Sequence, residues 1–351
     1  MPAEWEPHAA TWLVWPHEES DWPGKFAPIP WVYTEIVKAL ARHEPVNLLM
    51  QPDNEVDPVF HCLGQAGVDT ANVTFWAAET DRSWIRDSGP IFVVNNRGER
   101  AVIDWHFNAW AKYPNWTLDD RIPRFVADQQ GLRRWQPQCR GWRVVLEGGS
   151  IDVNGQGLML TTEECLLSTT QQRNPPLDLA DYERVFADYL GVKKVLWLGR
   201  GITGDDTHGH VDDLARFVNS QTVVTVLESN PADENYALLQ ENRERLEGAT
   251  DLNGHKLEVA TLPMPRPIIF DGMRLPASYA NFYIANGVVI VPTFNDPADR
   301  VALGILAELF PDREVVGIHC LDLVWGLGTL HCMTQQEPAP SVSNAPNELE
   351  S

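Results

Sequence analysis

Residues 296–318 read DPADRVALGILAELFPDREVVGI and join a helical segment to a short apolar strand. Asp296 is a residue type that caps helix N-termini, and Pro297 follows at the first helical position, where its missing N–H is not needed. The residues from Pro297 to Phe310 are therefore predicted to form a helix, and Glu314–Ile318 are predicted to form a strand.

This order of helix and strand occurs five times along the chain, with β-rich stretches between the copies. A ring of similar blades around one axial cleft, a mixed α/β propeller, accommodates such a repeat better than one continuous sheet. The competing architecture is a doubly wound sheet, but no GxGxxG motif opens a helix after a strand. The predicted helix and strand pairs are Trp31–His43 with Val46–Met50, Leu118–Gln130 with Val144–Leu146, Leu179–Leu190 with Val195–Leu198, Asp233–Glu247 with Leu257–Leu262, and Pro297–Phe310 with Glu314–Ile318.

Two terminal segments differ from this repeat. Residues 2–24 carry four tryptophans among prolines, which indicates either a rigid cap over the core or a wall of the active-site mouth. No linker divides the chain, so we expect a single domain over residues 1–338. The segment 339–351 is rich in Pro, Ser, Asn and Glu and is expected to be a disordered tail.

Composition narrows the class of protein. The 351 residues carry a net charge of -22, which argues against nucleic acid and anionic membrane surfaces as partners. Such a charge suits a small cationic substrate, although solubility alone is an equally good explanation. No apolar run is long enough to span a bilayer, and the first residues do not read as a signal peptide.

The five cysteines are an odd number without CxxC spacing, so they predict neither a disulfide framework nor a zinc knuckle. A reducing, cytoplasmic location is the expectation. The sequence is compatible with a homo-oligomer but does not determine the oligomeric state.

The C-terminal stretch GLGTLHCMTQQ, residues 326–336, places a thiol directly after a glycine-rich segment. Gly326 and Gly328 permit backbone angles and close approaches that other residues resist. A loop that presents one thiol to a ligand would need these features, so Cys332 is the candidate nucleophile.

Three further stretches combine acidic or histidine residues with glycine. In the segment 81–90, Asp87 could bind a cation beside the flat face of Trp84, although a salt-bridged turn is the simpler interpretation. Glu147 follows an apolar strand and precedes a Gly-Gly turn, where it faces either a ligand or solvent. If residues 209–213 are extended, His210 and Asp212 point to one face, about 7 Å apart.

The inventory is one thiol, one imidazole and two or three carboxylates. Carboxylates beside a thiol would raise its pKa and suppress the thiolate, which is unfavourable for a protease. They are favourable if the substrate is itself a cation, because a planar guanidinium offers N–H donors that carboxylates bind in pairs. The bound cation would then favour the thiolate.

At this point the motifs resemble the agmatine deiminase and bacterial peptidylarginine deiminase family. The similarity runs from Met1 to about Pro338, and the motifs occur in the family's order. They are WIRDSGP at 84–90, DW with FNAW at 104–110, LEGGS at 146–150, GHVD at 209–212, NFYIANG at 281–287, and residues 328–336.

The resemblance implies a pentein-type fold, a five-bladed α/β propeller with pseudo-five-fold symmetry, and residues 1–338 would be the deiminase catalytic domain. It makes Cys332 the nucleophile, His210 the general acid and base, and Asp87 and Asp212 the carboxylates that hold the guanidinium. Trp84 and Glu147 match substrate-pocket positions. The implied activity is hydrolysis of agmatine to N-carbamoylputrescine and ammonia through a covalent amidino-cysteine (thiouronium) intermediate, without metal or cofactor, in putrescine biosynthesis and polyamine metabolism.

The chain departs from the family pattern twice. His208 stands where agmatine deiminases commonly have asparagine, and Gly326-Leu327-Gly328-Thr329 replaces a Gly-Gly-Gly-Asn run. Neither departure involves the inferred catalytic residues, but both could change the pocket. Free arginine, peptidyl arginine or another small guanidine therefore stays open as the substrate.

Two alternatives have a different chemistry. A metal-dependent hydrolase would use the carboxylates and imidazoles of the segment 205–212, namely Asp205, Asp206, His208, His210 and Asp212. A guanidine- or polyamine-binding protein without activity would use the same acidic site and release no ammonia. Sensitivity to a thiol reagent and to a chelator distinguishes these hypotheses.

Overall fold

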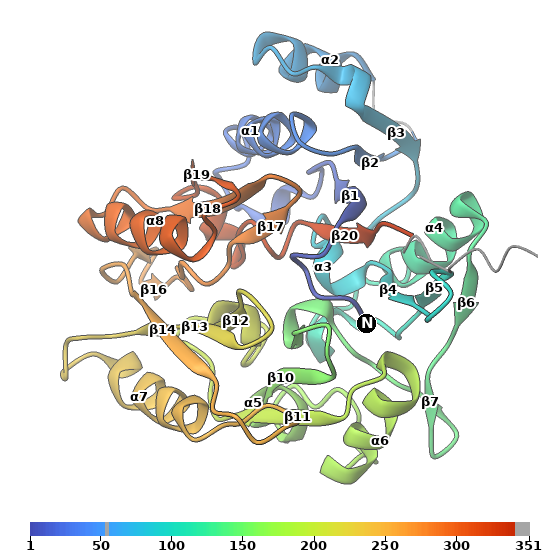
Figure 1. The fold of residues 1–351 in the computed structure, drawn as a ribbon. Helices are drawn as coiled ribbons and strands as arrows, with labels where there is room; N and C mark the ends of the chain where they lie inside the picture. Colours follow the sequence, from blue (N-terminus) through green and yellow to red (C-terminus); the bar gives the residue numbers. More distant parts are fainter. Residues whose placement is uncertain (53–55, 341–351) are drawn as a thin grey trace, which may run out of the picture.

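The structure of the protein is a computed structural model that describes residues 1–52 and 56–340. Residues 341–351, which form most of the expected tail, lie outside the described residues. In the described part of the chain, five sheets of three or four strands follow one another around a common centre (Figure 1). The helices that connect their strands lie on the outer side.

Each sheet repeats one topology, in which a strand pairs antiparallel with its neighbour on one side and parallel on the other. A helix connects each parallel pair, because parallel neighbours need a crossover. The sheets are β20 (Gln335–Pro338), β1 (His8–Val14), β2 (Val46–Met50) and β3 (Val73–Ala77); β4 (Ile91–Val94), β5 (Arg100–Ile103) and β6 (Arg133–Trp135); β9 (Asp152–Val153), β10 (Leu158–Thr162) and β11 (Lys194–Leu198); β12 (Ala215–Phe217), β13 (Thr222–Leu227) and β14 (Glu258–Pro263); and β17 (Tyr283–Ala285), β18 (Val288–Thr293) and β19 (Glu314–His319).

Two short hairpins and eight α-helices complete the described residues, together with short 3-10 turns. The crossover helices are α1, α2, α4, α6, α7 and α8, whereas α3 and α5 are short helices of four and five residues. The bounds are β7 (Gln138–Cys139) with β8 (Trp142–Arg143), β15 (Ile269–Phe270) with β16 (Met273–Arg274), α1 (Ile29–Ala41), α2 (Val56–Gln65), α3 (Ile85–Ser88), α4 (Ile122–Gln130), α5 (Glu163–Leu167), α6 (Leu179–Leu190), α7 (Glu234–Glu247) and α8 (Pro297–Leu309).

Local sequence explains where the crossover helices begin and end. Asp296 caps α8 by accepting from the backbone N–H of Ala298, and Pro297 occupies the first turn, as predicted. Gly191 ends α6 in the left-handed conformation that glycine adopts without steric cost. The five predicted helices are thus confirmed to within a few residues at each end, and the prediction of a mixed α/β protein is confirmed.

One predicted strand was wrong. The strand after α4 is β6, whereas Val144–Leu146 contribute only a single bridge between Val145 and His106. Val144, Val145 and Leu146 are apolar because they are buried, and burial alone does not make a strand. The outer strand β6 carries no apolar run, because two of its three residues are exposed.

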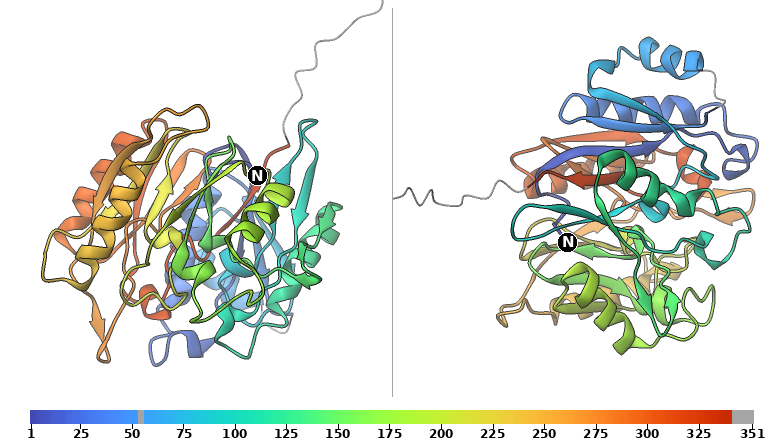
Figure 2. Two further views of the ribbon diagram at one scale, coloured as in Figure 1. Left: turned by 90° about the horizontal axis from the view of Figure 1, so that it is seen from below. Right: turned by 90° about the vertical axis from the view of Figure 1, so that its right-hand side faces the viewer.

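The ends of the described chain meet in one sheet. The C-terminal strand β20 pairs antiparallel with β1, and the two lie side by side near the N-terminus (Figures 1 and 2). The tryptophan-rich segment is therefore a buried strand followed by a loop, with Trp12 and Trp22 fully buried. Both expectations for this segment hold in part, since Ser20, Asp21 and Pro23 also line the cavity described below.

The apolar interior is one large cluster joined by smaller ones between the sheets and the outer helices. Among the described residues, none of the helices combines the length and the apolar character needed to cross a membrane.

Candidate active site

A cavity of about 380 Å³ opens among the loops near the centre of the ring. Its walls mix aromatic rings with carboxylates, as a site for an organic cation would. Of the residues singled out from the sequence, Trp84, Asp87 and Cys332 line it directly. The lining also includes Asp21, Arg82, Trp110, Tyr113, Asp206, Thr207, Met273, Trp325 and Leu327.

Cys332 lies between the turn η7 (Leu323–Gly326) and β20, and its side chain is almost completely buried. The amide of Asn281 donates to its Sγ at 3.2 Å, and Asp212 Oδ2 lies 3.8 Å from Sγ. Burial, with the nearby carboxylates of Asp212, Asp213 and Asp87, raises the pKa of the thiol well above its ordinary value. Acidic neighbours therefore suppress the thiolate in the free protein, as expected from the sequence.

The glycines before Cys332 are required by close packing. A Cβ on Gly328 would lie 2.6 Å from the Trp84 ring, and one on Gly326 would lie 2.5 Å from Trp22 Nε1. The left-handed position in this segment belongs to Leu327, with φ of 69°. Trp84 therefore packs against the loop that carries Cys332, and its Nε1 donates to Asp21 at 2.9 Å.

Asp87 sits on the single-turn helix α3 and is almost completely buried. Its Oδ2 accepts from Trp110 Nε1 at 2.9 Å, and its Oδ1 accepts from the backbone N–H of Gly149 at 2.9 Å. Burial raises the pKa of Asp87 although His210 opposes that shift. The alternative of an Arg86–Asp87 turn pair is not what the structure shows, because Arg86 contacts Glu4 and Gln336 instead.

His210 precedes the turn η6 (Val211–Asp213), so the extended conformation considered for residues 209–213 is not what the structure shows. Asp205 accepts from the backbone N–H groups of Gly209 and His210, which folds the segment into a loop. His210 Nδ1 nevertheless lies 3.7 Å from Asp87 Oδ1 and 4.0 Å from Asp212 Oδ1. The imidazole and both carboxylates therefore converge, at shorter range than a strand would give.

The charge of His210 follows from its surroundings. Burial lowers the pKa of the imidazole, but the Asp87 carboxylate, with Cys165 and Glu147, outweighs burial and raises it well above the ordinary value. Neither ring nitrogen has a hydrogen-bond partner within the described residues. A protonated imidazole with a free N–H is suited to donate a proton to a leaving group.

Glu147 lies behind His210 rather than in the lining of the cavity. Its Oε2 is 3.8 Å from His210 Nε2, while its Oε1 accepts from Arg173 Nε at 3.0 Å. Arg173 also donates to the carbonyl oxygens of Gln171 and Thr207. Although burial alone would raise the pKa of Glu147, Arg173 and His210 lower it to about 2. Glu147 thus contacts the candidate acid–base residue, and no sequence motif pointed to Arg173.

The acids proposed for a metal site have other partners. The Asp205 carboxylate accepts a hydrogen bond from the backbone N–H of Gly209. Asp206 forms an ion pair with Lys112 and accepts a hydrogen bond from the Tyr113 hydroxyl. In the part of the chain that the structure describes, the one group with metal-ligand spacing is Glu147, Cys165 and His210, with ligand atoms within 4.8 Å of one another. That group shares only His210 with the set named from the sequence.

Several contributors to the site were not predicted individually. Asn281 and Trp110 fell inside motifs quoted for the resemblance, but their contacts with Cys332 and Asp87 depend on the tertiary fold. Gly149 acts through its backbone N–H and through its lack of a side chain. Residue type alone does not reveal such contributions.

Comparison with known proteins gives consistent matches over nearly the whole chain. The family model of Porphyromonas-type peptidyl-arginine deiminase matches residues 1–338. An agmatine deiminase from Pseudomonas aeruginosa is 37% identical over 97% of this chain and 95% of its own length. The solved agmatine deiminase of Enterococcus faecalis is 34% identical, with a TM-score of 0.88 over 97% of this chain and 96% of that one.

A second solved structure is a cysteine-to-serine variant of the C. jejuni agmatine deiminase with substrate bound. It is 31% identical, with a TM-score of 0.84 over 96% of this chain and 95% of that one. Matches of this length and similarity show that the described residues adopt the same mixed α/β single-domain fold as these structures.

Proposed function

The chain belongs to the Porphyromonas-type peptidyl-arginine deiminase family, and from this membership we propose that it is an agmatine deiminase. The reaction is hydrolysis of a guanidino C–N bond, which converts agmatine and water to N-carbamoylputrescine and ammonia. The product is a precursor of putrescine, so the enzyme acts in polyamine metabolism. The observation that carries the proposal is that Cys332 and Asp87 line one cavity, with Asp212 Oδ2 3.8 Å from the thiol and His210 Nδ1 3.7 Å from Asp87 Oδ1.

The carboxylates are arranged to bind a guanidinium. Asp212 Oδ1 is buried and has no hydrogen-bond partner among the described residues, so it is free to accept from a substrate N–H. Each Asp87 oxygen accepts one hydrogen bond and retains capacity for another. Two carboxylates on one planar cation fix its orientation, which holds the guanidino carbon in a near-attack position against Cys332.

The cationic substrate also activates the nucleophile. In the free protein the thiol faces carboxylates and stays protonated, since its pKa is raised. A bound guanidinium neutralises part of that negative charge, which lowers the pKa of Cys332 and favours the thiolate. The substrate therefore promotes formation of the thiolate that attacks it.

The mechanism that fits this arrangement has two halves. The Cys332 thiolate attacks the guanidino carbon and forms a C–S bond; the terminal C–N bond breaks, and its nitrogen takes a proton from His210 and leaves as ammonia. In the resulting amidino-cysteine, His210 removes a proton from water as the water oxygen attacks the same carbon. The C–S bond then breaks, releasing the ureido product and the thiol.

The far end of agmatine is an ammonium, for which we propose Asp206 as the contact. Asp206 lines the cavity and is only partly buried, and its partner Lys112 is exposed enough to move aside. The lining holds two other acids: Asp87, which we assign to the guanidinium, and Asp21, which is enclosed by Arg82 and Trp84 and whose pKa burial raises to about 6. Asp206 is thus the more accessible negative charge.

The fold and the domain boundaries also support more specific proposals. The five repeats of antiparallel and parallel pairing support a pentein-type, pseudo-symmetric five-bladed propeller. Residues 1–338 form the deiminase catalytic domain. A cytoplasmic location, the absence of nucleic-acid and membrane partners, and roles for Trp84 and Glu147 in the substrate pocket stay predictions from the sequence. The sequence is compatible with a homo-oligomer.

Ammonia release from agmatine, arginine, a blocked arginyl peptide and other small guanidines tests the function. We expect turnover of agmatine that is abolished by prolonged treatment with iodoacetamide and unchanged by EDTA. Turnover of a different guanidine alone would refute the substrate but keep the chemistry. EDTA-sensitive turnover would support the metal hydrolase, and binding of agmatine without ammonia would support the inactive binding protein.

A further inference from the structure

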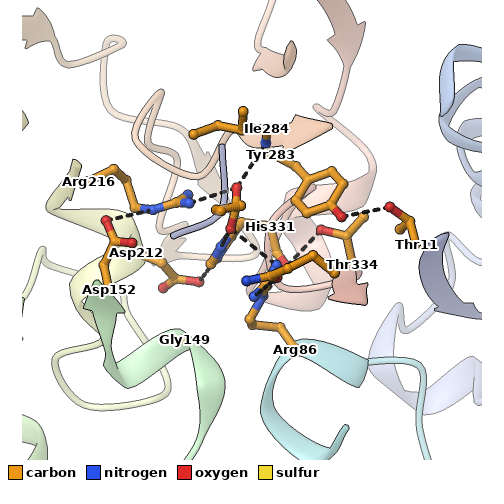
Figure 3. A network of polar contacts seen from close by, with 12 residues as sticks. Thr11, Arg86, Gly149, Asp152, Asp212, Arg216, Tyr283, Ile284, His331 and Thr334 are labelled. Carbon is orange, nitrogen blue, oxygen red and sulfur yellow. Dashed lines mark hydrogen bonds and ion pairs between the residues drawn. The ribbon is translucent and has the colours of Figure 1, made fainter. Parts of the chain in front are cut away.

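The residue before the candidate nucleophile has no role in the mechanism above. His331 is buried, and its two ring nitrogens face two carboxylates (Figure 3). Nδ1 lies 2.7 Å from Asp212 Oδ2, and Nε2 lies 2.8 Å from Glu4 Oε2. Both distances are those of charge-assisted hydrogen bonds.

The number of N–H groups on the ring decides how many of these carboxylates it can donate to. A neutral imidazole has one N–H, so it could donate to only one of two ionised carboxylates. Donation to both requires an imidazolium, which carries one positive charge between two negative ones. The ring of His331 is held between Glu4 and Asp212 through both of its nitrogens.

Glu4, from the segment before β1, is itself held in place. Arg216 Nη2 lies 2.8 Å from its Oε1, the backbone N–H of Ile284 donates to the same oxygen at 2.8 Å, and Arg86 Nη2 lies 3.4 Å from Oε2. Although burial raises the pKa of Glu4, Arg216 and His331 outweigh burial and hold it well below the usual range. Glu4 is thus an ionised anchor for His331.

The same network of polar contacts reaches Asp87, the other carboxylate that we assign to binding of the guanidinium. Arg86 is the neighbour of Asp87 in α3, and its Nε donates to the backbone carbonyl of His331 at 3.2 Å. Its backbone N–H donates to the carbonyl of Cys332 at 3.1 Å. The helix that carries Asp87 and the loop that carries Cys332 are therefore tied to one buried cluster.

The two oxygens of Asp212 differ as a result. Oδ2 accepts from His331, whereas Oδ1 has no partner in the described part of the chain. Rotation of the carboxylate would break the contact with His331. One oxygen is consequently used for orientation and the other is left for the ligand.

We propose that His331, anchored by Glu4, is a positioning residue that fixes the Asp212 carboxylate with Oδ1 free for the substrate guanidinium. This proposal rests on the proposed function, because it assigns a role within the same guanidinium site. His331 acts through Asp212 and need not touch the substrate.

The test uses two substitutions that each keep one of the two contacts. The amide nitrogen of asparagine matches the position of His Nδ1, so His331→Asn keeps a donor for Asp212 and loses Glu4. The amide nitrogen of glutamine matches His Nε2, so His331→Gln keeps Glu4 and loses Asp212. We would measure kcat, KM and the pH profile for both variants, with thermal unfolding as the control for the fold.

His331→Gln should lose kcat/KM on the order of 100-fold, the range for removing a hydrogen bond to a buried charged group, and His331→Asn about tenfold or less. The acidic limb for His331→Gln should also move to higher pH, because Asp212 loses its donor. The groups that remain around Asp212 are His210, Arg216, Asp87, Asp213 and Cys332. Equal losses, or a more active glutamine variant, would show that His331 only fills the core.

If neither variant folds, Glu4→Gln replaces them. It keeps an oxygen acceptor for His331 but removes the negative charge that anchors the ring. Although burial opposes it, the contact with His331 helps to lower the pKa of Asp212, so the acidic limb of kcat/KM should move to higher pH. An unchanged profile would overturn the positioning role. Failure of the wild-type protein to release ammonia from agmatine would refute the proposed function instead, and the variants would then be ranked on whichever guanidine the wild type hydrolyses.

Discussion

The substitution Gly149→Ala should nearly abolish turnover while leaving the protein folded. A Cβ at position 149 would lie 2.6 Å from His210 Nδ1, 2.8 Å from Asp87 Oδ1 and 2.9 Å from Asp212 Oδ2. Ordinary Cβ contacts begin at about 3.4 Å, so the imidazole would have to move by nearly 1 Å. One methyl group would therefore displace three of the four inferred catalytic side chains.

The magnitude follows from the geometry of attack. A displacement of about 1 Å from the near-attack position costs about 100-fold in rate, equivalent to about 2.7 kcal/mol in the activation free energy. The conformation of Gly149 itself does not require glycine, because its φ is not positive. Overpacking should cost about 1–3 kcal/mol of stability, so the thermal midpoint should fall by only a few degrees.

The assay is steady-state ammonia release, together with thermal unfolding of the same samples. Gly304→Ala is the matched control, because it adds the same methyl group on α8 with no atom within 4 Å of the new Cβ. The control should keep full activity and gain a little stability from helix propensity. A Gly149→Ala enzyme whose kcat stays within about threefold of the wild type would refute the proposed convergence of these groups.

Four further outcomes are expected. Asp206→Asn should raise KM for agmatine about tenfold and leave KM nearly unchanged for an alkylguanidine without the amine; equal effects on both would contradict the proposed ammonium contact. Alkylation of Cys332 by iodoacetamide in the free protein should be slow at neutral pH and accelerate about tenfold per pH unit, since the raised pKa keeps the thiol protonated; a pH-independent rate would argue against that environment. Arg173→Lys should lower kcat about tenfold with little change in KM, because lysine cannot hold Glu147 and two carbonyls together; a change in KM alone would place Glu147 in binding. Arg216→Met should lower the free energy of unfolding by about 3–5 kcal/mol in denaturant titration, since Glu4 and Asp152 lose their buried cation; a loss below about 1 kcal/mol would count against this pairing.

Five of the crossover helices were predictable because each combines apolar spacing with a capping residue. The short inner strands were not, since β9, β12 and β17 have two or three residues and are defined by their neighbours. The strand β1 was also missed, because its residues are buried on both faces and show no alternation of apolar and polar side chains. The three inner strands form short hairpins with the strands that follow them, whereas β1 pairs with β20 from the other end of the described chain, which a local pattern does not report.

The candidate site was predictable by residue type and only partly by geometry. In the sequence, the candidate carboxylates, the imidazole and the thiol each lie near glycines. A cationic substrate explains why acidic residues would surround the nucleophile. The extended geometry considered for His210 is not what the structure shows, because Asp205 captures two backbone N–H groups and Gly209 adopts a φ of 100°. The hydrogen bonds to the Asp205 side chain fold the segment into a loop instead of a strand. In this loop His210 lies 4.0 Å from Asp212, closer than the spacing of about 7 Å expected along a strand.

Closure of the ring explains how residues from both ends of the described chain share one site. The strand β20 follows the Cys332 loop directly and pairs with β1, so the loop is fixed on its C-terminal side by an N-terminal strand. Trp12 in β1 donates to Glu337 in β20, and Glu4, just before β1, reaches His331. Positions 4 and 331 are far apart in the sequence, but the antiparallel pairing of β1 with β20 makes them neighbours. The pairing of β1 with β20 therefore completes the first sheet. It also brings Glu4 to His331, which orients the Asp212 carboxylate that we assign to binding of the substrate.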